Sequence, residues 1–252
     1  MGTLGLMSAL NEELHLLMPA LVGTRTVMHA GREFHCGKLD GRDVVLVLSR
    51  VGKVAAATTA AMLVERFDAS ALVFTGTAGG LGAGVRVGDV VIARELLQHD
   101  MDASPLFPRH EVPLTGRSRF PADAVLADSL AKAARDALSA ERIGLAVSMG
   151  ALGIRSPQVH EGLVVSGDRF VATSIESAGL RAELPDALAV EMEGAAVAQV
   201  CHDCDVPFAV LRTVSDRADD SAHIDFTRFA NEVASPLAAA IVRTWLRRQE
   251  GT

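Results

Sequence analysis

The chain has 252 residues, and its hydrophobic fraction of 49% with only 4% aromatic residues predicts a large, mainly aliphatic core. Its formal net charge of −7 at pH 7 excludes the basic footprint that is typical of proteins that bind nucleic acids or anionic membranes. No apolar stretch approaches the roughly 18 residues of a membrane span, and the start of the chain lacks the cationic segment of a signal peptide, so we expect one cytoplasmic domain over residues 1–252.

The first half of the chain alternates short β-branched runs with alanine-rich amphipathic segments, the pattern that predicts an α/β fold. Its predicted strands span residues 3–10, 43–49, 71–82 and 87–93, and its predicted helices span residues 11–22 and 52–67. Residues 99–120 carry three prolines and no periodicity. They are expected to form a long loop, and a loop of this length in a compact domain is commonly functional or disordered.

The second half continues the same alternation. A helix opened by Pro121 is predicted over residues 121–138, because proline is favoured at the first helical position. The remaining predicted strands span residues 162–170, 187–190 and 208–216, and the remaining predicted helices span residues 175–184, 194–201 and 227–248.

The three cysteines do not form a disulfide framework. Cys201 and Cys204 match C-x-x-C, but they fall at the end of a predicted helix, whereas reactive pairs lie at the N-terminus, where the helix dipole stabilises a thiolate. The sequence gives little support for a zinc site, because the chain has no second pair of closely spaced cysteines. A structural role for the cysteines is favoured.

Small and acidic residues follow several of the predicted strands. In open α/β sheets, ligands bind beyond the carboxyl ends of strands, so these endings are expected to line one pocket. Each acid taken alone is more often a solvated surface residue, and the glycine run at residues 76–82 fits neither a dinucleotide motif nor a Walker A loop and is also compatible with a tight turn. The endings span residues 9–13, 75–82, 166–170, 191–194 and 215–219.

Eight segments spread over nearly the whole chain carry a family resemblance. In chain order they are LGLMSALNEELHLL, SRVGKVAAA, FTGTAGGL, VGDVV, VSGDRF, AVEMEGAAVAQVC, VPF and LRTVSDRAD. Together they resemble the 5'-methylthioadenosine/S-adenosylhomocysteine nucleosidases of the purine nucleoside phosphorylase superfamily. The resemblance implies a three-layer α/β/α sandwich with a central mixed sheet. It also implies hydrolysis of an N-glycosidic bond to release adenine, without a cofactor or a metal ion.

The resemblance also implies catalytic roles. Asp216 is expected to be the general acid toward N7 of the departing adenine, oriented by Ser215, and burial would favour its protonated form. Glu13 is expected to be the general base for the attacking water. Glu193 is expected to accept hydrogen bonds from the two ribose hydroxyls and to stabilise an oxocarbenium-like sugar. Arg212 is expected either near that water or in a buried structural ion pair.

Further residues are matched to the walls of the pocket. Phe170 is expected to stack on the adenine, and the backbone of Val171 to read the edge of the base. Met192 is expected to be an apolar wall against the sugar, although an ordinary core position is as compatible with its sequence. The other matched residues are Thr77 near the ribose, and Leu10 and Phe226 around the 5'-alkylthio group.

Two positions leave questions open. Alternation along a strand would aim Glu191 to the same side as Glu193, where it would hold the water or Arg212, or brace the site. Asn11 replaces the first of three glutamates often seen in the family, and the loop at residues 101–114 departs from the family pattern. The preference for the substrate tail therefore stays open.

Three other functions are compatible with a nucleoside pocket: phosphorolysis, hydrolysis of a different nucleoside, and binding without catalysis. Phosphorolysis requires cationic groups around a phosphate, whereas Glu13 offers a negative charge that would repel one, so hydrolysis is favoured. The same general acid, general base and ribose-binding carboxylate could also hydrolyse an aminodeoxyfutalosine-type nucleoside. A non-catalytic nucleoside-binding protein is disfavoured, because both Glu13 and Asp216 are present.

The expected partner is a small-molecule nucleoside, with no nucleic acid and no membrane. The resemblance implies a homodimer in which a loop of one subunit closes the pocket of its neighbour. In this chain Leu106 or Phe107 of the long loop would complete the alkylthio site in that way.

Overall fold

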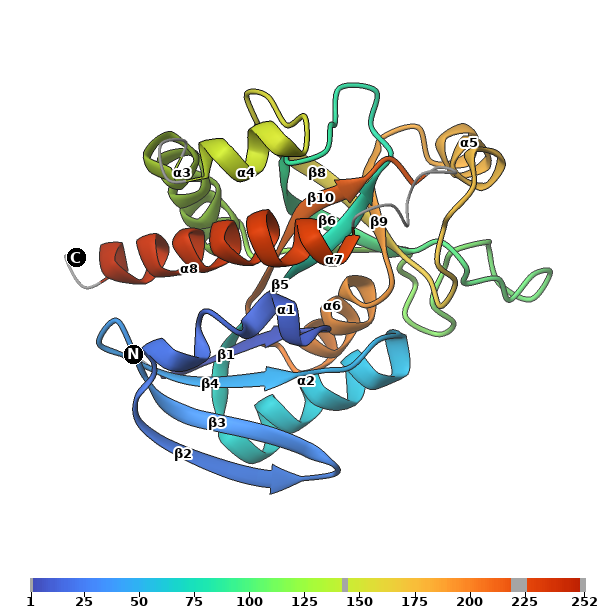
Figure 1. Ribbon diagram of the computed structural model, residues 1–252. Coiled ribbons are helices and arrows are strands. Elements are labelled where there is room, and N and C mark those ends of the chain that lie inside the picture. The colour runs from blue at the N-terminus through green and yellow to red at the C-terminus, as the bar shows by residue number, and fades with distance from the viewer. Residues whose placement is uncertain (1, 142–144, 219–225, 250–252) are drawn as a thin grey trace.

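The computed structural model describes residues 2–141, 145–218 and 226–249 (Figure 1). In these residues ten strands form one mixed sheet. The strands are β1 (Thr3–Ser8), β2 (Val22–His29), β3 (Arg32–Leu39), β4 (Arg42–Leu48), β5 (Ala69–Gly80), β6 (Val90–Gln98), β7 (Arg119–Pro121), β8 (Val159–Ser166), β9 (Ala187–Glu191) and β10 (Phe208–Asp216).

The order of the strands is β10-β6-β8-β9-β5-β1-β4-β3-β2, and β7 pairs with β6. Because β10 also pairs with β5, the strands from β10 to β5 close into a ring, and the rest continue from β5 as an open sheet that ends at β2. β5 and β9 are antiparallel and pair only through Gly79 with Val190 and Gly80 with Ala189. Their carboxyl ends therefore meet, although the two strands arrive from opposite directions.

Helices cover both faces of this sheet, so the three-layer α/β/α prediction is confirmed (Figure 1). One core cluster packs α1, α3 and α8 on one face, and a second packs α2 and α6 on the other. The helices are α1 (Asn11–Leu14), α2 (Lys53–Phe67), α3 (Ala124–Glu141), α4 (Ala146–Ala151), α5 (Ser174–Glu183), α6 (Gly194–Asp203), α7 (Phe226–Phe229) and α8 (Ser235–Gln249), with a 3-10 turn at Met18–Ala20 and a π-helical turn at Ala230–Ala234. Within the described ranges no helix has the length and apolar character needed to cross a bilayer.

β5 shows why the central strands are apolar almost without interruption. Ala71 and Val73 belong to the core cluster on the α3 and α8 face, whereas Leu72 and Phe74 belong to the cluster on the α2 and α6 face. Side chains alternate between the two faces of a strand, and a strand covered on both faces is therefore hydrophobic at every position. Burying each of the larger side chains contributes about 1.5–3 kcal/mol.

Two predicted helices begin or end elsewhere. The helix predicted over residues 11–22 ends after one turn at Leu14. Pro19 lies in the separate 3-10 turn at Met18–Ala20, since its ring cannot continue an α-helix from the preceding residues. The prediction that Pro121 opens a helix is wrong, because Pro121 lies in β7. The helix begins at Ala124, where Oδ1 of Asp123 accepts a hydrogen bond from the amide of Leu126 at 2.8 Å.

The hairpin of β2 and β3 was not predicted. β2 is exposed along most of its length, so its sequence lacks the alternation of apolar and polar residues that marks a half-buried strand. The strand predicted to begin at residue 87 begins at Val90, because Gly88, with φ of 90°, and Asp89 form a turn. The final helix is interrupted by the π-helical turn at Ala230–Ala234.

Candidate active site

A cavity of about 330 Å³ lies where β1, β5, β9 and β10 end. The turn before α2, the segment after β8 and the start of α7 complete its walls. The expectation that strand endings from distant parts of the chain line one pocket is therefore confirmed. The predicted residues on its walls are Leu10, Thr77, Phe170, Val171, Glu191, Met192, Glu193, Ser215, Asp216 and Phe226.

Two predicted site residues need a separate account. Glu13 lies in α1, which begins directly after the lining residue Leu10, but its side chain falls outside the part of the structure that is described. Arg212 is almost fully buried, with 1% of its surface exposed, and it contacts the lining residue Glu191 without lining the cavity itself.

Glu193 is the N-cap residue of α6, but its side chain does not cap that helix. Its Oε1 instead accepts a hydrogen bond of 2.8 Å from the amide of Gly52, at the N-terminus of α2. The first amides of a helix have no partner within the helix, and they carry the positive end of its dipole, so they stabilise a carboxylate. Asp168 accepts the next amide, that of Lys53, at 2.7 Å. The start of α2 thus fixes Glu193 at the cavity.

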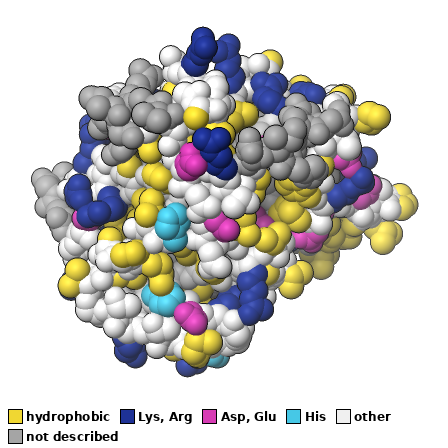
Figure 2. Space-filling view, in the orientation of Figure 1, with side chains coloured by type: hydrophobic (Ala, Val, Ile, Leu, Met, Phe, Trp, Pro, Cys, Tyr) yellow, Lys and Arg dark blue, Asp and Glu magenta, His cyan; other side chains and the backbone are white. Residues whose placement is uncertain are grey.

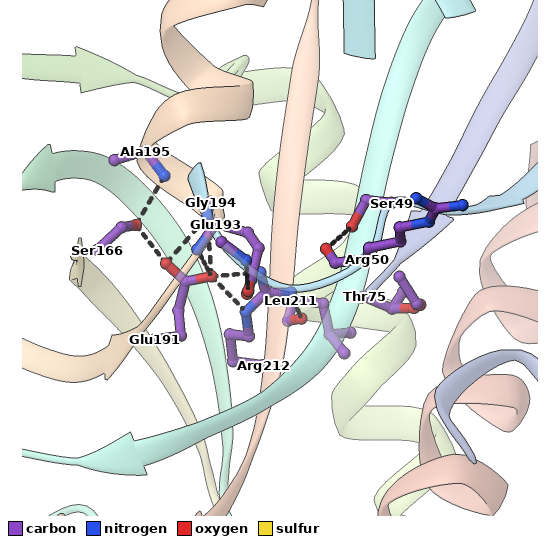
Figure 3. A network of polar contacts seen from close by, with 12 residues as sticks. Ser49, Arg50, Thr75, Ser166, Glu191, Glu193, Gly194, Ala195, Leu211 and Arg212 are labelled. Atoms are coloured by element: carbon purple, nitrogen blue, oxygen red, sulfur yellow. Dashed lines mark hydrogen bonds and ion pairs between the residues drawn. The ribbon is translucent and has the colours of Figure 1, made fainter. Parts of the chain in front are cut away.

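Glu191 ends β9 and is buried in a network of hydrogen bonds (Figure 3). Its carboxylate accepts the amide of Glu193 at 3.1 Å and that of Gly194 at 2.8 and 2.9 Å, so it caps α6 from the preceding strand. Ser166 donates its hydroxyl to Glu191 and accepts the amide of Ala195 at 2.7 Å. These contacts fix the turn that carries Met192 and Glu193.

The counter-charge of Glu191 is Arg212. Nη2 of Arg212 lies 2.5 Å and Nε 3.2 Å from Oε2 of Glu191, and the guanidinium lies 4.1 Å from the centre of the Phe74 ring. A buried carboxylate is costly unless it is paired and hydrogen-bonded, and this one is both. Of the two expectations for Arg212, the structure shows the buried ion pair. Of the roles left open for Glu191, it shows two, the contact with Arg212 and the bracing of the turn that carries Glu193.

Asp216 is the last residue of β10, and 8% of its surface is exposed. Its Oδ2 accepts the hydroxyl of Ser215 at 2.7 Å, and its Oδ1 accepts the amide of Ala218 at 2.7 Å. Ser215 also donates to the carbonyl of Ala78 in β5, at 3.4 Å. The carboxyl group is therefore held in one orientation against the end of β5.

We expect Gly79→Ala to lower the free energy of unfolding by about 1–3 kcal/mol, because an added methyl group would overpack a filled site. A Cβ atom at Gly79 would lie 2.9 Å from Cβ of Ala218 and 3.0 Å from Oδ1 of Asp216. The matched control is Gly84→Ala, where no heavy atom of the described residues lies within 4 Å of the added Cβ. Urea unfolding measures both variants, and equal stabilities would contradict close packing around Asp216.

Six lining residues had no individual role in the sequence prediction. Four of them, Ala9, Ala78, Gly79 and Arg169, lie in strand endings that were expected to line the pocket, whereas Val51 and Val190 lie outside those endings. Val51 and Val190 are apolar, and their side chains gave no chemical signal of a role. Ser166, which orients Glu191, also lies in a predicted ending, but a single serine after a strand does not indicate which residue it contacts.

The C-x-x-C pair lies at the C-terminal end of α6, away from the helix N-terminus that would stabilise a thiolate. Cys201 is buried in the last turn of α6, and burial raises the pKa of its thiol far above the ordinary value. Cys204 is exposed at the end of the same helix. Across residues 2–141, 145–218 and 226–249 no group of three or more His, Cys, Asp or Glu side chains is placed to hold a metal ion.

Comparison with known proteins adds independent findings. The chain matches the phosphorylase superfamily over residues 3–247. It is 35% identical, over 92% of each chain, to a 5'-methylthioadenosine/S-adenosylhomocysteine nucleosidase of Anoxybacillus flavithermus. It superposes with a TM-score of 0.85 on the nucleosidase of Neisseria meningitidis in complex with methylthio-immucillin-A, at 35% identity over 98% of this chain and 100% of that chain. A futalosine hydrolase mutant of Helicobacter pylori gives a TM-score of 0.82 at 28% identity, over 98% of this chain and 100% of that chain.

Proposed function

We propose that this chain, which belongs to the 5'-methylthioadenosine/S-adenosylhomocysteine nucleosidases of the phosphorylase superfamily, hydrolyses the N-glycosidic bond of both nucleosides. The products are adenine and the corresponding 5-thioribose. The observation that carries the proposal is one cavity lined by two aromatic and several apolar side chains together with buried acids, among them Glu193 from the β9–α6 turn and Asp216 from β10.

The departing adenine is the first group that the enzyme must stabilise. As the bond breaks, negative charge develops on the base, and a proton delivered to N7 neutralises it. Asp216 supplies that proton in this proposal. Its two fixed hydrogen bonds, from Ser215 and from the amide of Ala218, support the assignment, because a general acid must be oriented before the transition state forms.

The ribose is the second group, and it becomes positively charged. Glu193 accepts hydrogen bonds from the 2'- and 3'-hydroxyls and stabilises that charge, since both effects require an ionised carboxylate held close to the sugar. The hydrogen bond from the amide of Gly52 supports this role, because it holds the carboxylate in one orientation at the cavity. Met192 and Thr77, which line the same cavity, are assigned to the ribose wall.

The attacking water requires a base, and Glu13 is assigned to it. Support comes from the position of its helix, because α1 begins at the residue that follows the cavity-lining Leu10. Glu191 and Arg212 do not take this role in the proposal. They act as positioning residues, since Glu191 caps α6 and Arg212 compensates its charge.

The two ends of the substrate are assigned to apolar walls. Phe170 stacks on the adenine, and the backbone of Val171 contacts the edge of the base. Leu10 and Phe226 surround the 5'-alkylthio group. The support is that all four residues line the cavity. Phe170 and Val171 come from the segment after β8, Leu10 from the segment between β1 and α1, and Phe226 from α7.

The test is an assay of adenine release. Purified protein is incubated with 5'-methylthioadenosine, S-adenosylhomocysteine or adenosine, each with and without inorganic phosphate. We expect adenine from the first two without phosphate, because a carboxylate at position 13 repels a phosphate nucleophile. Strict dependence on phosphate would assign the chain to phosphorolysis, and release from none of them would favour a nucleoside-binding protein.

A second candidate is hydrolysis of a futalosine-type nucleoside. The observation in its favour is the fold similarity to the futalosine hydrolase of Helicobacter pylori, at 28% identity. The higher identity of 35% to nucleosidases acting on methylthioadenosine and S-adenosylhomocysteine ranks it second. Adding aminodeoxyfutalosine to the assay distinguishes the two.

We further propose that the whole chain acts as one nucleoside phosphorylase-like domain in a cytoplasmic homodimer. Leu106 is 85% exposed in the long loop and Phe170 at the cavity is 48% exposed, and an apolar contact between two copies would cover surfaces of this kind. The loop of one subunit would then close the alkylthio end of the neighbouring cavity. Sedimentation of the purified protein tests the dimer.

A further inference from the structure

A second cavity, of about 930 Å³, adjoins the first. It lies between α1, β3 and the turn that follows β4, and its walls include Ala9, Leu10 and Val51, which also line the first cavity. Figure 2 shows this face of the molecule, where histidine, acidic and basic side chains lie close together over α1, β3 and β4. Because Leu10 is assigned to the 5'-alkylthio group, the second cavity begins where a longer 5'-substituent would continue.

Two arginines, Arg32 and Arg50, line this cavity. Among the described side chains their hydrogen bonds go to backbone carbonyls, and no Asp or Glu there forms an ion pair with either of them. Arg32 donates to the carbonyls of Ala30 at 3.0 Å and Ala55 at 3.2 Å, and its Nε is buried without an acceptor among the described residues. Burial and the charge of Arg50 lower the pKa of Arg32. An anion placed between the two guanidinium groups would relieve this repulsion.

The backbone of Arg50 gives an independent indication. Its φ of 70° lies in the left-handed region, which costs free energy for any residue with a side chain and favours glycine. Strain of this kind is found preferentially at binding sites. The guanidinium donates to the carbonyl of Gly31 and extends away from Glu191 and Glu193 (Figure 3). The side chain of Arg50 therefore belongs to the second cavity and not to the first.

The cavity also carries the opposite charge. Glu12 and Glu33 line it together with the two arginines, so it offers acceptors for an ammonium group and donors for a carboxylate. Two guanidinium groups fit a carboxylate especially well, because their donors match its two oxygens. A cavity of this composition suits a zwitterion, and an α-amino acid is the common zwitterion.

We infer that the second cavity binds the amino-acid end of the 5'-substituent of S-adenosylhomocysteine, with Arg50 and Arg32 holding its carboxylate. The inference rests on the proposed function, which supplies the substrate. Arg50 directly precedes Val51, which lines both cavities, so one step of about 3.8 Å along the backbone separates the shared wall from a residue of the anion site. 5'-Methylthioadenosine, which ends in a methyl group, has no group that would use this cavity.

The test compares two substrates on matched variants. We expect Arg50→Gln to lower the ratio of kcat/KM for S-adenosylhomocysteine to that for 5'-methylthioadenosine by about tenfold, the loss that corresponds to one charge-assisted hydrogen bond. Arg50→Gly should lower the ratio equally while relieving the left-handed backbone, so a lower ratio in this variant is not a result of strain. The control is Arg25→Gln, which removes the same charge from exposed β2 outside both cavities and should leave the ratio unchanged.

A third substrate isolates the carboxylate. We expect the wild type to use the α-carboxamide of S-adenosylhomocysteine about tenfold less efficiently than the parent compound, and Arg50→Gln to remove most of that difference. An unchanged ratio in both Arg50 variants would overturn the subsite. An equal fall in Arg25→Gln would also overturn it, because general charge steering would then explain the effect. If the wild type releases adenine from neither nucleoside, the proposed function itself fails, and that result is distinct from a failure of the subsite.

Discussion

Asp216→Asn is expected to slow the release of adenine by about a thousandfold, the middle of the range for loss of a general acid. Asparagine has nearly the volume of aspartate, and its carbonyl oxygen can still accept the amide of Ala218, which lies 2.7 Å from Oδ1 in the wild type. The side-chain amide has no acidic proton to give to the base. Turnover is therefore lost while the cavity keeps its shape.

The measurement separates catalysis from binding. Adenine release gives kcat, and calorimetric titration of the variant with S-adenosylhomocysteine gives the affinity, which should stay within about threefold of the wild-type KM, a change of less than 1 kcal/mol. The control is Asp203→Asn, which removes an exposed carboxylate at the end of α6. Asp216 is not the acid if its variant keeps wild-type turnover.

Arg212→Met is expected to lower the free energy of unfolding by about 3–5 kcal/mol, the usual cost of removing one partner from a buried ion pair. Methionine is apolar and flexible enough to fill much of the space against the Phe74 ring. The carboxylate of Glu191 then stays buried, with Ser166 and the amides of α6 as its partners but without a positive charge. The loss is therefore mainly electrostatic.

Urea unfolding measures this loss. The matched control is Arg228→Met, which breaks an exposed pair with Glu232 one helical turn away and should cost no more than about 0.5 kcal/mol. Glu191→Gln combined with Arg212→Met should recover part of the stability, because the unpaired charge is removed. A cost for Arg212→Met as small as that of the control would contradict the structural role assigned to the buried pair.

The central strands of the sheet were predictable from the sequence because both of their faces are covered. The strand predicted over residues 208–216 has those bounds in the structure, since Phe208–Asp216 alternates between two apolar cores. β2 could not be predicted in this way, because one exposed edge strand buries too little surface to impose a pattern. Closure of the ring through β10 and β5 was also hidden, since pairing between distant strands leaves no local signal.

The candidate site was predictable to the extent that its residues carry charge or follow strands. The strand endings that contain Glu193 and Asp216 were marked on those grounds, the family resemblance then singled out these two acids, and both line the cavity. For Glu191 the sequence left three roles open, which were to hold the water, to hold Arg212 or to brace the site. Choosing among them required the register of β9 against β8, which brings Ser166 opposite Glu191, and the position of β10, which carries Arg212. Both depend on tertiary packing.

The position of β10 has a consequence for the local stability of the site. β10 is hydrogen-bonded to β5 on one side and to β6 on the other, whereas β2 ends the sheet and pairs only with β3. Amide hydrogens in strands paired on both sides exchange with solvent only through large opening events, and those in an edge strand exchange through small ones. Asp216 and Arg212 therefore lie on a strand that opens late. Arg32 lies in β3, one strand from the open edge. In the proposed binding mode the adenine end of the substrate would contact the part of the molecule that is expected to exchange slowly, and the amino-acid end a part that can adjust without unfolding it.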